Sequence, residues 1–118
     1  MERNHRSLKA WQEAIELVDC LYVATDSFPT DERFGLISQI RRACVSVPAN
    51  IAEGFARSGS KELLHFLSIA TGSLSELDTL IEICGRRGLI ADTHPLVERI
   101  DRVSALVLAL SASIRKRL

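Results

Sequence analysis

The spacing of the apolar residues constrains this chain most, because they recur every three or four positions in four successive stretches. That period is typical of amphipathic helices, and no stretch shows the strict alternation expected of a half-buried strand. Short breaks separate the stretches, and they contain Pro29, Gly59 and Gly88. We therefore predict four helices, at about 8–25, 31–56, 61–87 and 95–116.

The predicted helices are long and their connections are short, so the chain must run back and forth. We expect one all-α domain over residues 1–118, an antiparallel up-down four-helix bundle. Apolar residues make up 47% of the sequence and aromatic residues only 5%, a composition that suits helices packing on helices. In the last stretch the apolar spacing alternates between four and three, which favours left-handed packing.

Each predicted helix carries an apolar stripe. In the first helix the stripe is Leu8, Trp11, Ile15, Val18 and Tyr22, widened by Ala14 and Leu21. In the third it is Leu63, Phe66, Leu67, Ala70, Leu74, Leu77 and Ile81. In the fourth it is Leu96, Ile100, Val103, Val107, Leu110 and Ile114.

The second predicted helix has more apolar surface than a small bundle requires. Its polar residues gather in one narrow stripe, and the rest of its circumference is apolar apart from Ser38 and Arg41. A bundle helix needs an apolar face of little more than about 100°, and this one has about twice that. Either its own chain surrounds the helix or another copy covers the surplus, and we favour self-assembly. The predicted oligomer interface comprises Arg41, Val45, Pro48, Ala49, Ala52 and Ala56.

Pro48 lies in the middle of this helix, where proline removes a backbone donor and disturbs the preceding turn at a cost of about 3 kcal/mol. We expect a kink there. The kink either reshapes the surface offered to a neighbouring copy or curves the helix around its own core, and the sequence leaves both readings open.

The narrow polar stripe supplies a second group of candidate site residues. Together with Lys61, at the start of the third predicted helix, the group is Arg42, Asn50, Glu53, Arg57 and Lys61. Either they form a structural network that holds the second helix to its neighbour, or they contact an anion or nucleic acid in an assembled ring.

The composition limits which other functions and compartments we expect. Fifteen basic and fifteen acidic residues cancel, whereas a dedicated nucleic-acid binder usually carries a positive balance. The three cysteines have no zinc-ligand spacing and read as core residues of a reducing compartment. The first residues contain no apolar signal core, and no apolar run reaches membrane-spanning length. We expect a cytoplasmic protein without a membrane partner.

No constellation of residues predicts catalysis. His5, His65 and His94 lack metal-ligand spacing, and no carboxylate or thiol is placed beside them by sequence. No glycine-rich phosphate loop is present. We therefore expect a non-enzymatic protein with no catalytic residue, no metal site and no cofactor.

The central stretch FGLISQIRRACVSVPANIAEGFARS, residues 34–58, resembles a known family signature. The likeness extends to LKAWQEAIELV at residues 8–18 and to ELLHFLSIATGSLSELDTLIEI at residues 62–83. It is similar to the bacterial four-helix-bundle family named for open reading frames in intervening sequences of 23S ribosomal RNA genes. The likeness covers about residues 8–115, although the fourth helix contributes only its apolar pattern.

The resemblance implies a left-handed up-down bundle that assembles into a ring-like homopentamer. A related branch, the accessory variability determinant of diversity-generating retroelements, binds nucleic acid and associates with a reverse transcriptase. That branch is strongly basic, whereas this chain is neutral. The leading expectation is a self-assembling scaffold or adaptor, with a nucleic-acid-binding accessory protein as the alternative.

Overall fold

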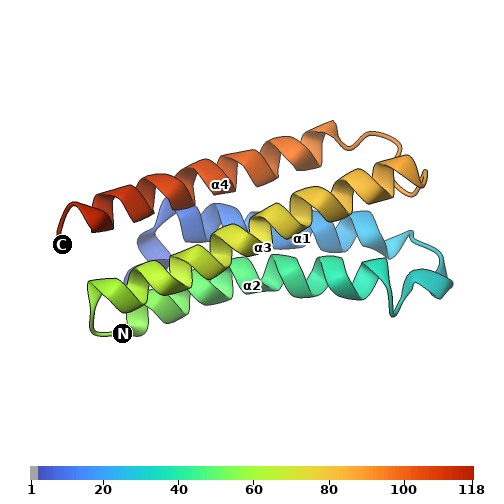
Figure 1. Cartoon of the computed structure of the whole chain (residues 1–118). Helices are drawn as coiled ribbons and strands as arrows, with labels where there is room; N and C mark the ends of the chain where they lie inside the picture. The colour runs from blue at the N-terminus through green and yellow to red at the C-terminus, as the bar shows by residue number, and fades with distance from the viewer. Residues whose placement is uncertain (1–2) are drawn as a thin grey trace.

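A computed structural model describes residues 3–118 and contains four α-helices in that part of the chain. They are α1 (Lys9–Asp26), α2 (Leu36–Ala56), α3 (Ser60–Arg86) and α4 (His94–Arg115). Two short 3₁₀ helices, η1 (Asn4–Ser7) and η2 (Thr30–Glu32), precede α1 and α2. Figure 1 shows all four α-helices lying along one long axis.

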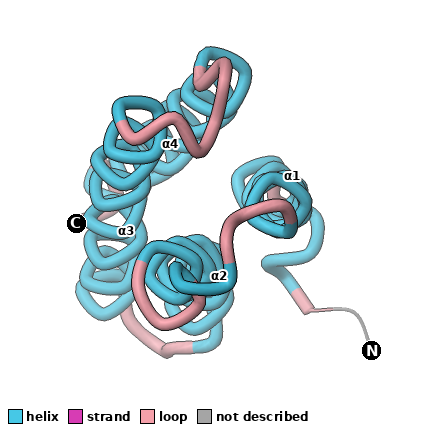
Figure 2. Tube along the Cα trace, turned by 90° about the vertical axis from the view of Figure 1, so that its right-hand side faces the viewer, coloured by secondary structure: helices cyan, strands magenta, loops and turns pink. Residues whose placement is uncertain are grey.

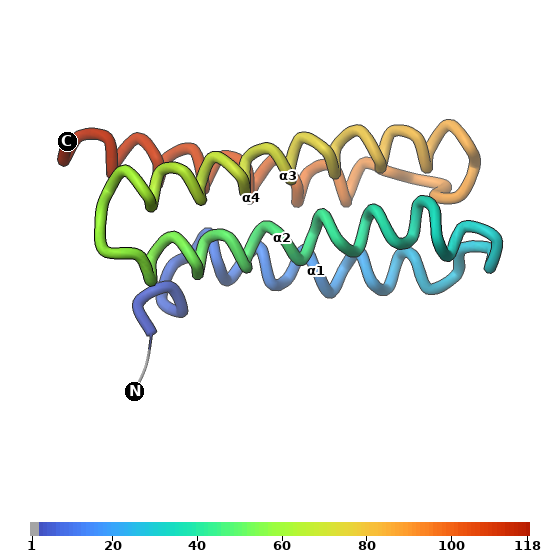
Figure 3. Tube along the Cα trace, turned by 60° about the horizontal axis from the view of Figure 1, so that its bottom comes forward, coloured from blue at the N-terminus to red at the C-terminus, as the bar shows by residue number. Residues whose placement is uncertain are grey.

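Each helix packs against two of the other three helices. Helix α2 packs against α1 and α3, and α4 packs against the same two helices. Within residues 3–118, no Cα atom of α1 lies within 8 Å of one in α3, and the same holds for α2 and α4, so these pairs are diagonal. Figures 1 and 3 show the chain turning back at each connection, and Figure 2 shows the helices nearly end-on. The fold measures 45 × 26 × 20 Å.

The core runs the length of the bundle and is built from aliphatic side chains of all four helices. On α3 and α4 the buried residues follow the predicted stripes, with Phe66, Leu96 and Leu110 only half-buried at the margins. The largest fully buried side chains are Leu17, Leu21, Ile40, Val47, Ile51, Leu67, Leu74, Leu77, Ile81, Ile100, Val103 and Ile114.

Helix α1 uses a different face from the one its bulkiest residues suggest. Its buried side chains are Ala10, Ala14, Leu17, Leu21 and Thr25. In the predicted stripe, Leu8, Trp11 and Val18 are half-buried and Ile15 and Tyr22 are each 38% exposed. The helix therefore carries two apolar stripes: one is fully buried, and the other packs only partly against the bundle and leaves Ile15 and Tyr22 exposed.

The helix ends follow local backbone chemistry. Helix α2 begins at Leu36 rather than near Asp31, because Thr30–Glu32 form a 3₁₀ turn and Gly35, at φ −105° and ψ −107°, interrupts the helical backbone. Helix α3 ends at a glycine with φ +75°, Gly88. There the amide of Leu89 donates to the carbonyl of Cys84 at 2.9 Å, and the half-buried Leu89 side chain packs against the core. This is the Schellman arrangement that a left-handed glycine makes possible.

Gly54 lies close against α3, near the α2–α3 connection. A Cβ placed there would lie 2.9 Å from Cδ1 of Leu63 and 3.1 Å from Cβ of Phe66. A larger residue would force Leu63 and the backbone near Phe66 to shift, so Gly54 allows the C-terminal end of α2 to pack tightly against α3.

Candidate interaction surface

Most of the broad apolar side of α2 is covered by its own chain. Because α2 lies between α1 and α3, it buries residues on two flanks: Ile40, Ala43, Cys44, Val47, Pro48, Ile51 and Gly54. Leu36, Ile37, Ala52 and Phe55 are half-buried. The surplus apolar surface left to solvent is thus narrower than the sequence suggested, and it centres on Val45, Ala49 and Ala56.

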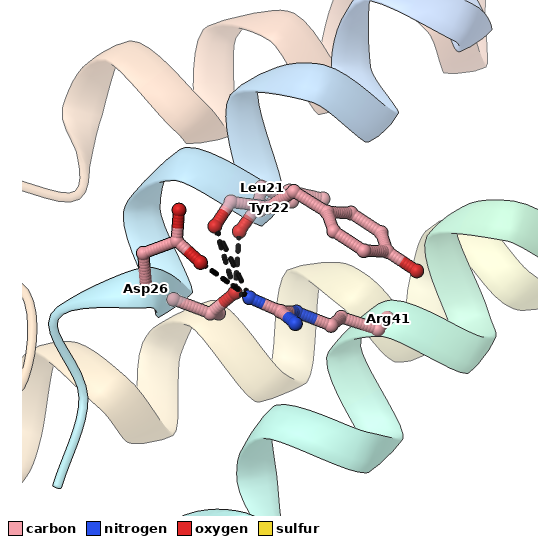
Figure 4. A network of polar contacts seen from close by, with 5 residues as sticks. Leu21, Tyr22, Asp26 and Arg41 are labelled. Atoms are coloured by element: carbon pink, nitrogen blue, oxygen red, sulfur yellow. Dashed lines mark hydrogen bonds and ion pairs between the residues drawn. The ribbon is translucent and has the colours of Figure 1, made fainter.

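Arg41 was predicted at an interface between copies, and the structure places it instead between α1 and α2 of one chain. Its Nε donates to the hydroxyl of Thr25 at 3.0 Å, and an Nη atom donates to Asp26 Oδ1 at 3.0 Å and to the carbonyl of Tyr22 at 3.3 Å. Its guanidinium carbon lies 4.4 Å from the centre of the Tyr22 ring. Figure 4 shows Arg41 reaching from α2 to the last turn of α1.

This contact satisfies groups that the helix end leaves open. The last carbonyls of a helix have no partner within it and carry partial negative charge, so a cation is favoured there. Thr25 is buried, and its hydroxyl also donates to the carbonyl of Leu21 at 2.8 Å. Arg41 is therefore a fixed part of the α1–α2 contact.

Pro48 was also predicted at the interface, and it is buried within its own chain. Helix α2 continues through it from Leu36 to Ala56. Of the two readings that the sequence left open, this burial favours the one in which Pro48 faces its own core.

Two apolar rows remain incompletely covered on the outer side of α1 and α2. We call them the outer rows: Trp11, Ile15, Val18 and Tyr22 on α1, and Val45, Ala49, Ala52 and Ala56 on α2. Both have the spacing four, three, four, which is the spacing of a seam that packs against another helix. In the α2 row, Val45 is 44% exposed, Ala49 and Ala56 are exposed and Ala52 is half-buried.

Contacts at both ends of the outer rows place them on neighbouring parts of the surface. At one end, Tyr22 of the α1 row stacks with Arg41, one turn before Val45. At the other end, the ring of His5 lies 5.2 Å from that of Trp11. His5 also lines a hollow of about 550 Å³ on the α2 row. The hollow is lined by Arg3, Asn4, His5, Ala49, Ala52, Glu53, Phe55 and Ala56.

The polar stripe of α2 is divided by the fold into separate groups. Asn50 donates to the carbonyl and the hydroxyl of Ser46, at 2.8 and 2.9 Å, and the hydroxyl of Ser73 on α3 donates to that of Ser46 at 2.9 Å. All three side chains are half-buried. They form a polar link between α2 and α3. For Asn50 this corresponds to the structural network, one of the two roles that the sequence left open. The role of Ser73 was not predicted, since sequence showed only small residues at this point of α3.

The charged members of the stripe lie at different places. Arg57 is 3.6 Å from Glu53 and 3.9 Å from Glu62, and its guanidinium lies 5.1 Å from the centre of the Phe66 ring. It is thus held against α3 by carboxylates of its own chain. Lys61 is exposed at the start of α3, whereas Arg42 is exposed in the first half of α2. The five predicted residues do not form one cluster.

Reactive chemistry is sparse in the described residues. Cys44 and Cys84 are buried and Cys20 is half-buried, and all three are free thiols. Burial raises the pKa of the Cys44 thiol from its ordinary 9.0 to about 11, so the thiol stays protonated at neutral pH. Within residues 3–118, no group of three or more potential ligands is placed to hold a metal ion. None of the helices in that range combines the length and the apolar character needed to cross a membrane.

Comparison with known families accounts for this architecture. The model of the 23S rRNA-intervening sequence protein family matches residues 6–109, which span all but the end of α4. The chain belongs to this family. No curated protein sequence matches the chain significantly. For a 23S rRNA-intervening sequence protein, the outer rows of α1 and α2 are the candidate site, because there two neighbouring helices each leave a row of apolar side chains incompletely covered.

Proposed function

We propose that this protein is a non-enzymatic, self-assembling bundle that acts as a cytoplasmic scaffold or adaptor. Copies would meet through the outer rows of α1 and α2. One observation carries the proposal: two neighbouring helices present rows with seam spacing, and Ile15, Tyr22 and Val45 in those rows remain 38–44% exposed.

The chemistry of the two rows suits packing between helices. The α2 row has three alanines, so another helix can approach its backbone closely, and the α1 row supplies the bulky side chains that would fill such a contact. Association would remove these side chains from water, which is the main favourable term in most protein–protein contacts. Contiguous apolar surface on a small domain usually marks an interface.

The resemblance supports a particular form of assembly. The resemblance implies a ring-like homopentamer of left-handed up-down bundles. We propose that copies of this chain form such a ring through α1 and α2. Soluble homo-oligomers are generally closed and symmetric, which is in keeping with a ring.

Light scattering coupled to gel filtration tests the proposal. We expect a mass several times the 13.1 kDa of one chain at micromolar concentration. Ala49→Glu should reduce that mass because it places a charge in the α2 row, whereas Ala109→Glu, at an exposed position on α4, should leave it unchanged. A wild-type mass of one chain would refute the proposal.

A further inference from the structure

The neutral chain is electrically polarised along the bundle. Figures 1 and 3 place both chain ends and the α2–α3 connection at the same end of the bundle. The half of the bundle at that end comprises residues 3–15, 47–72 and 105–118, and it holds eight basic and three acidic side chains. The remaining described residues, 16–46 and 73–104, hold seven basic and eleven acidic ones. A balanced sequence has therefore folded into a molecule with one positive end.

The three acidic side chains of these residues are all engaged. Glu53 and Glu62 both face Arg57, and Glu13 pairs with Arg102 on α4. Seven exposed cations at the same end have no carboxylate within 4.0 Å among residues 3–118: Arg3, Arg6, Lys9, Lys61, Arg115, Lys116 and Arg117. Arg6 lies 5.3 Å from the centre of the Trp11 ring, a contact that orients its charge without neutralising it.

Helix stability accounts for Arg115 but not for Lys9 and Lys61. Arg115 lies at the C-terminal end of α4, where a cation is favoured. Lys9 and Lys61, however, lie in the first turns of α1 and α3, where the helix dipole disfavours positive charge, and α1 has no acidic residue in its first turn. The two lysines are thus placed against the local electrostatics of folding, which suggests that their charge serves another purpose.

We propose that this end of the bundle binds a phosphodiester backbone, of RNA or DNA, through charge and without reading bases. The two shorter extents of the whole fold are 26 and 20 Å, and they bound the width of this end. Duplex nucleic acid carries one charge per about 1.7 Å, so a segment of that length presents roughly a dozen phosphates to the seven cations. The binding surface consists of Arg3, Arg6, Lys9, Lys61, Arg115, Lys116 and Arg117.

Two other anionic partners fit the surface less well. The opposite half of a second copy carries eleven acidic side chains, but seven basic ones are interspersed with them, so it offers no continuous negative surface. A membrane-binding surface combines cations with an apolar face that enters the lipid. At this end the large exposed apolar side chains, Ile15, Ile69, Leu108 and Leu118, come from three different helices and the residues after α4, and they do not form one stripe.

The test is fluorescence anisotropy with a labelled 20-nucleotide RNA and a 20-base-pair DNA in 50–200 mM KCl. With four to six phosphates neutralised, affinity should fall about 10²- to 10³-fold across this range. Lys9→Gln with Lys61→Gln should lower the slope of log affinity against log salt by about two. The matched control, Arg42→Gln with Arg99→Gln, removes the same charge from exposed positions in the other half and should leave the slope unchanged.

Each alternative result overturns the inference. Absence of binding to both probes at 50 mM KCl would do so. An equal loss of affinity in the two double variants would also do so, because the total charge of the protein would then determine binding. Sedimentation with vesicles containing 30% phosphatidylserine but no binding to either nucleic acid would identify a membrane partner. Association at low salt that requires Lys9 and Lys61 without nucleic acid would identify stacking of copies. Light scattering on the same samples reports self-assembly separately, so either proposal can fail alone.

Discussion

The side chain of Arg41 donates from Nε to the hydroxyl of Thr25 at 3.0 Å, and this bond, with those to Asp26 and the Tyr22 carbonyl, joins the first half of α2 to the last turn of α1. The two residues are 16 positions apart in the chain. Their contact also fixes the edge of the outer rows, because Arg41 lies one turn before Val45 and stacks on Tyr22. A residue that resembles an isolated polar exception on a helical wheel thus holds two helices in register.

We predict that Arg41→Lys lowers the free energy of unfolding by about 1–2 kcal/mol, because an ammonium cannot reproduce the fork that reaches Thr25, Asp26 and the Tyr22 carbonyl together. Urea unfolding followed by circular dichroism measures the loss. The neighbouring Arg42→Lys, at an exposed position, should change stability by less than about 0.5 kcal/mol. Equal effects at both positions would contradict the role assigned to Arg41.

Two glycines should respond in opposite directions to the same substitution. Gly54→Ala should cost about 1–3 kcal/mol, since the added Cβ would lie 2.9 Å from Leu63 and 3.1 Å from Phe66. Gly72→Ala should stabilise the protein by about 0.5–1 kcal/mol, because Gly72 lies inside α3 with no atom within 4 Å of a new Cβ. Thermal unfolding of both variants checks the pair. A stable Gly54→Ala protein would show that α2 and α3 can move apart there.

How far the fold follows from sequence differs between helices. On α3 and α4 one apolar stripe exceeds the alternatives, and most of the buried residues are predicted ones; Leu80, Cys84 and Ser111 are buried in addition. On α1 two stripes compete, and the row with Trp11 and Tyr22 looks stronger because its side chains are larger. The bundle buries Ala14 and Leu21, which were predicted at the margin of that stripe, together with Ala10, Leu17 and Thr25, which were not predicted. Local periodicity cannot choose between them, because the choice depends on how closely α2 and α4 approach.

The candidate surfaces show a similar limit. The apolar excess on α2 was visible in the sequence, but its covering by α1 and α3 was not. Pro48 and Arg41 were predicted at an interface between copies, and within one chain Pro48 is buried and Arg41 contacts the end of α1. The positive end was not predictable from net charge or from local runs. It forms only when three reversals of the chain bring residues near 3–9, 57–61 and 115–117 to one end.

Buried Cys44 should make stability fall at alkaline pH. Its pKa is about 11 in the folded protein and near its ordinary 9.0 in the unfolded chain. Between these values the unfolded state has lost the proton and the folded state has kept it, so stability decreases as pH rises from about 9 and levels off above about 11. The full effect is about 2–3 kcal/mol. Urea unfolding of wild type and Cys44→Ala at several pH values should give a difference that shrinks over this window, and parallel curves would contradict the assignment.

The last prediction concerns concentration. If copies cover the outer rows of α1 and α2, association stabilises the folded state by mass action, so the melting temperature should rise as the protein concentration increases. Ala49→Glu should flatten that dependence, because the carboxylate would be buried without a partner in the associated form. Ala109→Glu on α4 adds the same charge at an exposed site and should keep the wild-type dependence. Scanning calorimetry between about 5 and 500 μM makes the comparison, and a wild-type melting temperature independent of concentration would mean that the rows stay uncovered in solution.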